Sequence, residues 1–134
     1  MPVLSRLLKS IACSIVLLGM MAMFSLLPAY ALDEVSESNF EDIITNNDVV
    51  LVDFCAIWAG TCRILEPILD RVQADLGDTV KIVAMDVDAN LEIALHYAVR
   101  NVPTMILFRN GKVANTLMGA HPQSEIVGFI QSNS

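Results

Sequence analysis

Apolar residues dominate two consecutive stretches in the middle of the chain, and their spacing predicts two different elements. Residues 49–54, Val-Val-Leu-Val-Asp-Phe, form a near-continuous apolar run, which is typical of a central strand buried on both faces. From Thr61 to Leu76 the apolar residues recur at intervals of three and four, which is the period of an amphipathic helix. Pro67 falls inside this helix and predicts a kink, because proline removes a backbone hydrogen bond.

Shorter patterns on either side predict further helices and strands. Ser38, with Glu41 three residues later, has the spacing of a capping box and predicts the N-cap of a short helix. The segment Arg109-Asn110-Gly111-Lys112 predicts a hairpin, since Asn-Gly is a strong turn signal between strands. The remaining expected elements are an edge strand at 33–35, a strand at 80–87, a helix at 91–99, strands at 104–108 and 113–118, and a helix at 122–130.

The order of these elements predicts an α/β fold. Crossovers through helices imply that the early strands pair in parallel, and the late hairpin implies antiparallel pairing. We therefore expect a mixed central β-sheet flanked by helices on both faces. The domain formed in this way spans residues 32–134.

The first 31 residues predict an export signal outside this domain. Arg6 and Lys9 precede a stretch from 10 to 32 without a charged side chain, and Ala29-Tyr30-Ala31 supplies the small residues of a cleavage site. The alternative is an uncleaved membrane anchor through residues 10–32, since about 20 apolar residues span a bilayer. Both interpretations place the domain outside the cytoplasm, in the periplasm or an equivalent lumen, because positive charge stays inside.

The charge of the chain narrows the classes of partner. The net charge is −7, and without Arg6 and Lys9 the remaining six basic side chains face fifteen acidic ones. We therefore expect no nucleic-acid partner, because phosphate binding needs a basic surface. The cysteines and histidines are few and scattered, so the sequence predicts no metal site and no cofactor.

Several short motifs occur together in an order that is typical of one family. They are the strand at 49–54, the segment Ala56-Ile57-Trp58-Ala59-Gly60-Thr61-Cys62-Arg63, Pro67 in the next helix, Val102-Pro103-Thr104, the hairpin at 108–111, and Gly119. Over about residues 35–132 they resemble the thioredoxin family. The resemblance implies a thioredoxin fold, a cis proline at Pro103 facing the active site, and protein or peptide clients.

The active-site segment departs from the family pattern. In the family's Trp-Cys-Gly-Pro-Cys turn the first cysteine attacks the client disulfide, but that position is Ala59 here, which leaves a degenerate A-x-x-C site. Cys62 matches the second, resolving cysteine, and Asp53 matches the buried aspartate that helps to deprotonate it. Thr61 replaces the active-site proline, and Cys55 replaces a tryptophan.

The two cysteines of the domain each allow two interpretations. Cys55 either forms a disulfide with Cys62 or fills the core in place of tryptophan, and a disulfide requires Cα atoms within about 7 Å. Cys62 is either a reactive thiol or a buried, inert one. Met85 takes the place of the lysine that the resemblance puts near the aspartate.

Two functions therefore compete. We expect a protein that binds clients without two-cysteine turnover, because thiol–disulfide exchange needs an attacking thiolate. The alternative is a thiol–disulfide oxidoreductase in redox homeostasis that uses Cys62, alone or with Cys55. Recruitment to a membrane complex is a further alternative. The residues expected to bind the client are Trp58, Ala59, Gly60, Thr61, Val102, Pro103, Thr104 and Gly119.

Overall fold

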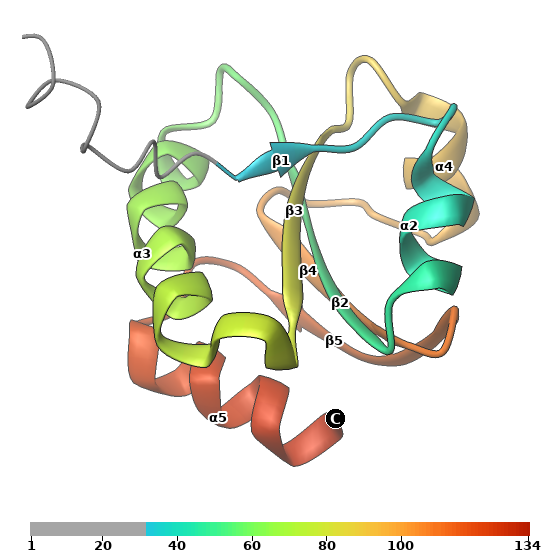
Figure 1. Ribbon diagram of the computed structural model, residues 1–134. Coiled ribbons are helices and arrows are strands. Elements are labelled where there is room, and N and C mark those ends of the chain that lie inside the picture. Colours follow the sequence, from blue (N-terminus) through green and yellow to red (C-terminus); the bar gives the residue numbers. More distant parts are fainter. Residues whose placement is uncertain (1–31) are drawn as a thin grey trace, which may run out of the picture. The chain divides into compact units, whose positions relative to one another are not determined.

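The computed structural model describes residues 32–134, in which helices and strands follow one another in close succession (Figure 1). The elements are β1 (Asp33–Glu34), α2 (Phe40–Asn46), β2 (Val49–Cys55), α3 (Gly60–Leu76), the 3₁₀ turn η2 (Gly77–Thr79), β3 (Lys81–Asp86), α4 (Leu91–His96), β4 (Thr104–Arg109), β5 (Lys112–Met118) and α5 (Gln123–Asn133). The expected signal peptide or anchor at 1–31 lies outside the described residues. From residue 32 onward, no helix has the length and apolar character needed to cross a membrane.

The strands form one mixed sheet in the order β1-β3-β2-β4-β5. The strand β3 pairs in parallel with both β1 and β2. The chain passes through α2 after β1 and through α3 after β2, so that all three strands run in the same direction. The strand β4 pairs antiparallel with β2 and with β5, to which the Asn110-Gly111 turn joins it. The prediction of a mixed parallel and antiparallel sheet is confirmed.

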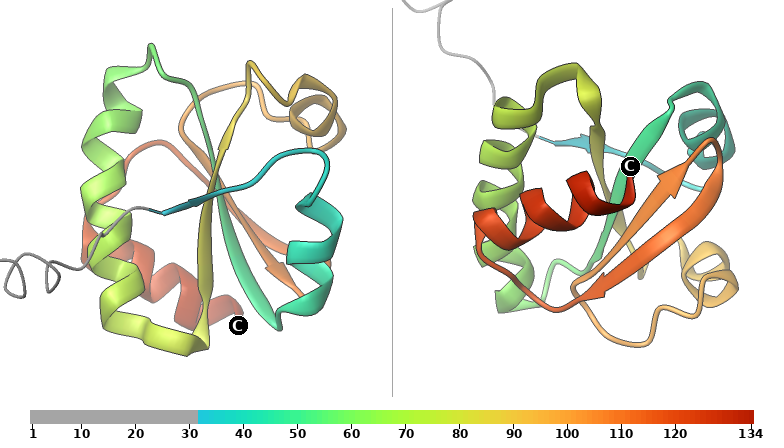
Figure 2. Two further views of the ribbon diagram at one scale, coloured as in Figure 1. Left: turned by 45° about the horizontal axis from the view of Figure 1, so that its top comes forward. Right: turned by 90° about the horizontal axis from the view of Figure 1, so that it is seen from below.

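Helices cover both faces of this sheet (Figure 1, Figure 2). The helices α3 and α5 pack on one face, where Leu65 and Leu69 of α3 and Ile126 of α5 share a buried cluster with Leu51 of β2. The helices α2 and α4 lie on the opposite face. Consecutive side chains of β2 point to opposite faces, so its apolar run serves both clusters.

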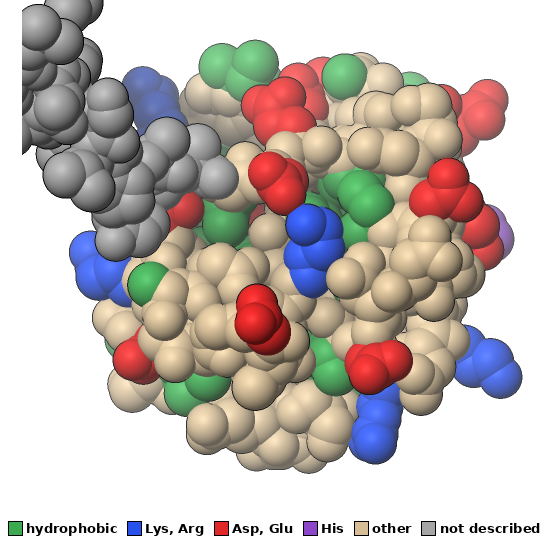
Figure 3. All heavy atoms as spheres, in the orientation of Figure 1, with side chains coloured by type: hydrophobic (Ala, Val, Ile, Leu, Met, Phe, Trp, Pro, Cys, Tyr) green, Lys and Arg blue, Asp and Glu red, His purple; other side chains and the backbone are tan. Residues whose placement is uncertain are grey.

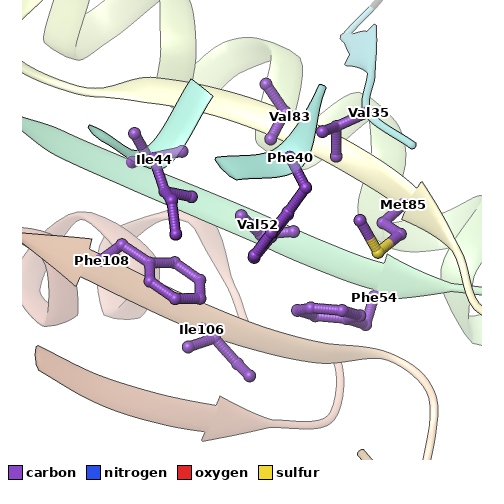
Figure 4. Close-up of a cluster of buried hydrophobic side chains, with 10 residues drawn as sticks. Val35, Phe40, Ile44, Val52, Phe54, Val83, Met85, Ile106 and Phe108 are labelled. Atoms are coloured by element: carbon purple, nitrogen blue, oxygen red, sulfur yellow. The ribbon is translucent and has the colours of Figure 1, made fainter. Parts of the chain in front are cut away.

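The cluster under α2 and α4 is rich in aromatic rings. Phe40 of α2 lies edge-on to Phe108 of β4, with ring centroids 5.6 Å apart, and Val52 and Phe54 of β2 complete the floor (Figure 4). Burying one such side chain stabilises a fold by roughly 1.5–3 kcal/mol. The cluster under α2 and α4 therefore stabilises the fold, and β2 lies between two buried apolar clusters.

Two helix boundaries differ from those expected. The helix α2 begins at Phe40 with Asn39 as its N-cap, not Ser38, because the Ser38 hydroxyl bonds to Ser36 Oγ at 2.8 Å instead of to the helix. The helix α4 ends at His96, three residues early, since Ala98 adopts a left-handed φ of 56°. The long helix α3 continues through Pro67 to Leu76.

Charged side chains are scattered over the surface outside these layers. Acidic groups are spread over the face seen in Figure 3, with lysine and arginine side chains between them. Lys81 of β3 pairs with Asp33 of the short edge strand β1 at 3.0 Å. Exposed pairs of this kind contribute little to stability, about 0–1 kcal/mol. The domain therefore depends on its two apolar layers.

Candidate functional site

Cys55 and Cys62 form a disulfide that links the end of β2 to the start of α3. Cys55 is the last residue of the strand, and Cys62 is the third residue of the helix. Their Cα atoms lie 5.7 Å apart, within the range that a disulfide requires. Of the two interpretations of Cys55, the structure therefore gives the disulfide partner and not the filler in place of tryptophan.

A short turn brings the two cysteines together. The Cys55 carbonyl accepts the Val87 N–H at 2.9 Å, which holds the strand end against the β3–α4 connection. The Ala59 N–H then donates to the Ala56 carbonyl at 3.1 Å, and Ala59 becomes the N-cap of α3. The chain thus reverses within a few residues, so that the first turn of α3 lies over the face to which Cys55 points.

Both sulfur atoms lie in a small apolar cluster. Ala59 is 6% exposed and Cys62 is 7% exposed, and the partly buried Cys55, Val87 and Val102 pack around them. Ala59, which the resemblance puts at the position of the family's attacking cysteine, therefore packs in the same apolar cluster as the two cysteines. Cys62 is buried in this cluster, whereas Cys55 remains partly exposed.

Asp53 is a buried carboxyl group directly beside the disulfide. It is 3% exposed, and its Oδ1 atom lies 3.4 Å from Cys55 Sγ, because residues two apart in a strand share a face. Burial, and to a lesser extent the charge of Glu66 on α3, raises the pKa of Asp53 from 3.8 to about 7. The carboxyl group therefore changes its protonation state near neutral pH.

The residue facing Asp53 across the sheet is Ala84, so the comparison with Met85 drawn from the sequence was wrong. The register pairs Asp53 with Ala84 of β3 and with Met105 of β4. Met85 is buried in the cluster on the opposite face, beside Phe54, since neighbouring residues of a strand point in opposite directions (Figure 4). Neither residue paired with Asp53 supplies a cation.

A groove beside the disulfide gathers most of the residues expected to bind a client. It has a volume of about 650 Å³ and its lining includes Trp58, Ala59, Gly60, Thr61 and Val102. Trp58 is 69% exposed at the rim. The tryptophan therefore belongs to the surface and not to the core, as expected.

The opposite wall of the groove was missed at the level of sequence. It includes Leu91, Leu95 and Arg100, and the two leucines are 59% and 67% exposed. Their spacing of four residues in a short helix predicts that they share a face. The sequence carried that signal, but not that the face is left open to solvent.

Three expected site residues lie outside the lining of the groove. The Val102–Pro103 peptide bond is cis, as the resemblance implied. The Gly119 N–H donates to the Pro103 carbonyl at 2.8 Å, and the Thr104 hydroxyl donates to the Asn101 carbonyl at 2.6 Å. These bonds hold the loop before β4 against the end of β5.

A metal ion has no evident place in the part of the chain that the structure describes. Within residues 32–134 no group of three or more His, Cys, Asp or Glu side chains is close enough to hold one.

The chain is similar to thioredoxins in both sequence and structure. The thioredoxin family profile matches residues 31–132. A thioredoxin of Rickettsia bellii is 38% identical over 74% of this chain and 95% of its own length, and one of Haemophilus influenzae is 36% identical over 74% and 94%. The solved structure of a mutant thioredoxin from Halobacterium salinarum superimposes with a TM-score of 0.69 at 32% identity, covering 76% of this chain and 88% of the other.

These findings correct the expectation of a client-binding protein without two-cysteine turnover. That expectation rested on Ala59, which does remove the usual first cysteine. The structure nevertheless joins Cys62 to Cys55, and the relatives are named thioredoxins, so a redox-active protein fits better. Because the family profile matches residues 31–132 of the 134-residue chain, the chain belongs to the thioredoxin family.

Proposed function

We propose that this protein is a thiol–disulfide oxidoreductase whose redox pair is Cys55 and Cys62. The observation that carries the proposal is their disulfide, which joins the end of β2 to the first turn of α3. In the reduced form the pair holds two thiols. Passing two electrons to a client disulfide closes the Cys55–Cys62 bond and leaves the client with two thiols.

The proposed clients are proteins with an accessible disulfide. The groove beside Trp58 supports this, because an exposed indole next to Leu91 and Leu95 offers an apolar surface for a client segment. Its lining also includes Gly60 and Thr61, which directly precede Cys62 in α3. A client seated there would bring its own disulfide close to Cys62.

We further propose that the domain works outside the cytoplasm. The basic residues before the uncharged stretch at 10–32, and the small residues at 29–31, support export to the periplasm or an equivalent lumen. If the stretch is not removed, it would hold the domain at a membrane. Disulfides persist in such oxidising compartments.

The test is reduction of insulin by dithiothreitol, followed as turbidity, with the purified protein as catalyst. We expect the wild-type protein to accelerate the reaction and both Cys55→Ser and Cys62→Ser to lose that acceleration. Cys13→Ser is the matched control, because it removes the third cysteine but leaves the pair intact. A wild-type rate no higher than that of the double variant Cys55→Ser/Cys62→Ser would refute the proposal.

A further inference from the structure

His121 joins the end of β5 to the first turn of α5 through both nitrogens of its ring. Nδ1 lies 2.8 Å from Oε2 of Glu125, in the first turn of α5. Nε2 lies 2.8 Å from the carbonyl oxygen of Met118, the last residue of β5. The side chain of His121 is 27% exposed, so both contacts are partly shielded from water. This arrangement of His121, Met118 and Glu125, the His121 bridge, ties the sheet to a helix.

Both partners of the His121 ring are hydrogen-bond acceptors. At neutral pH a carboxylate and a carbonyl oxygen have no hydrogen to donate, and a neutral imidazole carries one N–H. Both contacts are therefore hydrogen bonds only when His121 is an imidazolium, which donates from both nitrogens. When the proton leaves, a nitrogen lone pair faces either Glu125 or the Met118 carbonyl oxygen, and that contact becomes repulsive.

The surroundings of His121 favour the imidazolium. The hydrogen bond to Glu125 and then the bond to the Met118 carbonyl raise the pKa of His121 from 6.5, although partial burial opposes them. Because the folded state then binds the proton more tightly than the unfolded state, the bridge stabilises the fold fully below about pH 6.5. This contribution is lost as the pH rises through the raised pKa.

Other charged groups near this connection have partners or positions of their own. On α3, Arg71 donates to Gln123 Oε1 at 3.3 Å, and Asp75 lies in a surface hollow that Gln123 also lines. On β4, the residue paired with Met118 is Thr104, which does not titrate. The carboxylate of Glu125 is therefore the charge that acts on the ring.

The end of β5 that His121 holds is itself bonded to the loop before β4. Gly119 follows Met118, has a left-handed φ of 87°, and donates its N–H to the Pro103 carbonyl at 2.8 Å. A Cβ on Gly119 would lie 4.0 Å from His121 Nε2, so the ring lies beside this residue. Pro103 follows Val102, which lines the groove and packs around the two cysteines. Contacts therefore run without a gap from His121 to the redox pair.

We propose that protonated His121 positions the loop of Val102 and Pro103 for the client, so that client binding weakens when the imidazolium loses its proton. The inference rests on the proposed function and makes His121 a positioning residue that acts through Gly119. The helix α5 is a firm support, because Ile126 beside Glu125 is 0% exposed. A loop that is already held loses less conformational entropy on binding, so opening the bridge raises the client concentration that is needed.

Two substitutions separate the bridge from its proton. In Glu125→Gln the amide donates to an unprotonated Nδ1 while Nε2–H donates to the Met118 carbonyl, so a neutral His121 keeps both bonds. His121→Ala makes neither bond at any pH. His96→Ala is the matched control, because it removes the other histidine, an exposed residue at the end of α4.

The first test needs no client. NMR follows the Cε1–H signal of His121 against pH in the oxidised protein, together with hydrogen exchange of the Gly119 amide. We expect Glu125→Gln to lower the titration midpoint of His121. In the wild-type protein the Gly119 protection factor should fall several-fold as the pH rises through that midpoint. An unchanged midpoint in Glu125→Gln, or a wild-type protection factor that does not follow the titration of His121, would overturn the proposal.

The second test measures client binding with pre-reduced protein and a fluorescence-quenched peptide that contains one disulfide. Single-turnover rates against peptide concentration separate the half-saturating concentration, which reports binding, from the rate at saturation, which also reports the titration of Asp53 and the cysteines. Between about pH 6 and about pH 8 the half-saturating concentration should rise about 3–10-fold in the wild-type protein and in His96→Ala, which corresponds to the loss of about one hydrogen bond.

The same concentration should stay low in Glu125→Gln and high in His121→Ala, with little dependence on pH in either. A wild-type value that does not change with pH, or an equal rise in all four proteins, would overturn the role of His121. Absence of any turnover by the wild-type protein would instead refute the proposed function, and the NMR titration would still decide whether the bridge holds Gly119. The two failures are therefore distinguishable.

Discussion

Trp58 Nε1 donates a hydrogen bond to Asp88 Oδ2 at 2.8 Å, which ties the turn before α3 to the segment that follows β3. The bond fixes the orientation of an indole that is otherwise 69% exposed. Both residues line the same groove, so this bond shapes the surface that a client meets. The position of Trp58 is thus set by a residue 30 positions away in the sequence.

Trp58→Ala should weaken client binding more than it affects the fold. We expect KM for insulin to rise by about 5–30-fold, because an aromatic side chain at an interface often contributes about 1–2 kcal/mol. The midpoint of thermal unfolding should change little, since most of the Trp58 side chain is exposed to solvent. Val113→Ala, at an exposed site on β5, is the control and should leave KM unchanged. Equal KM values for the two variants would contradict this role of Trp58.

Opening the disulfide should lower the stability of the domain. Closing a loop across a sequence separation of 7 residues stabilises the folded state by about 2–3 kcal/mol, through the lost entropy of the unfolded chain. Urea unfolding of the oxidised and the reduced protein measures the difference. The free energy of unfolding of the variant Cys55→Ala/Cys62→Ala should be the same with and without reductant. If reductant also leaves the wild-type value unchanged, the disulfide does not form in solution.

Asp53 should make stability depend on pH in a definite direction. Its pKa is raised from 3.8 to about 7 in the folded protein, so between these values the folded state binds more protons than the unfolded state. The contribution of Asp53 to the free energy of unfolding should therefore be fully present below about pH 4. It should be lost as the pH rises through about 7, which lowers the free energy of unfolding by an amount on the order of a few kcal/mol.

Asp53→Asn checks this dependence, because it keeps the shape of the side chain and removes the titration. The wild-type free energy of unfolding should fall between about pH 5 and about pH 8, and the variant should lose most of that slope. Urea unfolding at both pH values gives the measurement. Asp75→Asn should retain the wild-type slope, and the idea fails if Asp53→Asn retains it too.

Leu69→Ala should destabilise the domain through the packing of α3 on the sheet. Leu69 is 0% exposed, and its truncation should cost about 2–5 kcal/mol through lost burial and the cavity left behind. Ile64→Ala, on the same helix but 63% exposed, should change the free energy of unfolding by less than about 0.5 kcal/mol. Chemical denaturation compares the two. A similar loss in both variants would show that α3 is not held by this face.

The layers of the fold were predictable because they depend on local patterns. The apolar run at 49–54 and the helical spacing from Thr61 to Leu76 correspond to β2 and α3 within one residue at each end. The Asn-Gly turn placed the last hairpin correctly. Such patterns survive in sequence because a strand or helix must present its apolar side chains to the core at a fixed period.

The chemistry of the site was not predictable in the same way. By itself the sequence determined that Ala59 lacks a nucleophile, that Cys62 and Asp53 sit at family positions, and which segments surround them. Only the tertiary structure decided that Cys55 reaches Cys62 and that Asp53 contacts Cys55. The reasons are geometric: the disulfide depends on how α3 folds back over β2, and the spacing of residues along a chain does not fix the distance across such a turn. The Asp53–Cys55 contact lies within β2, where residues two apart share a face, but its burial depends on the elements that pack on that face.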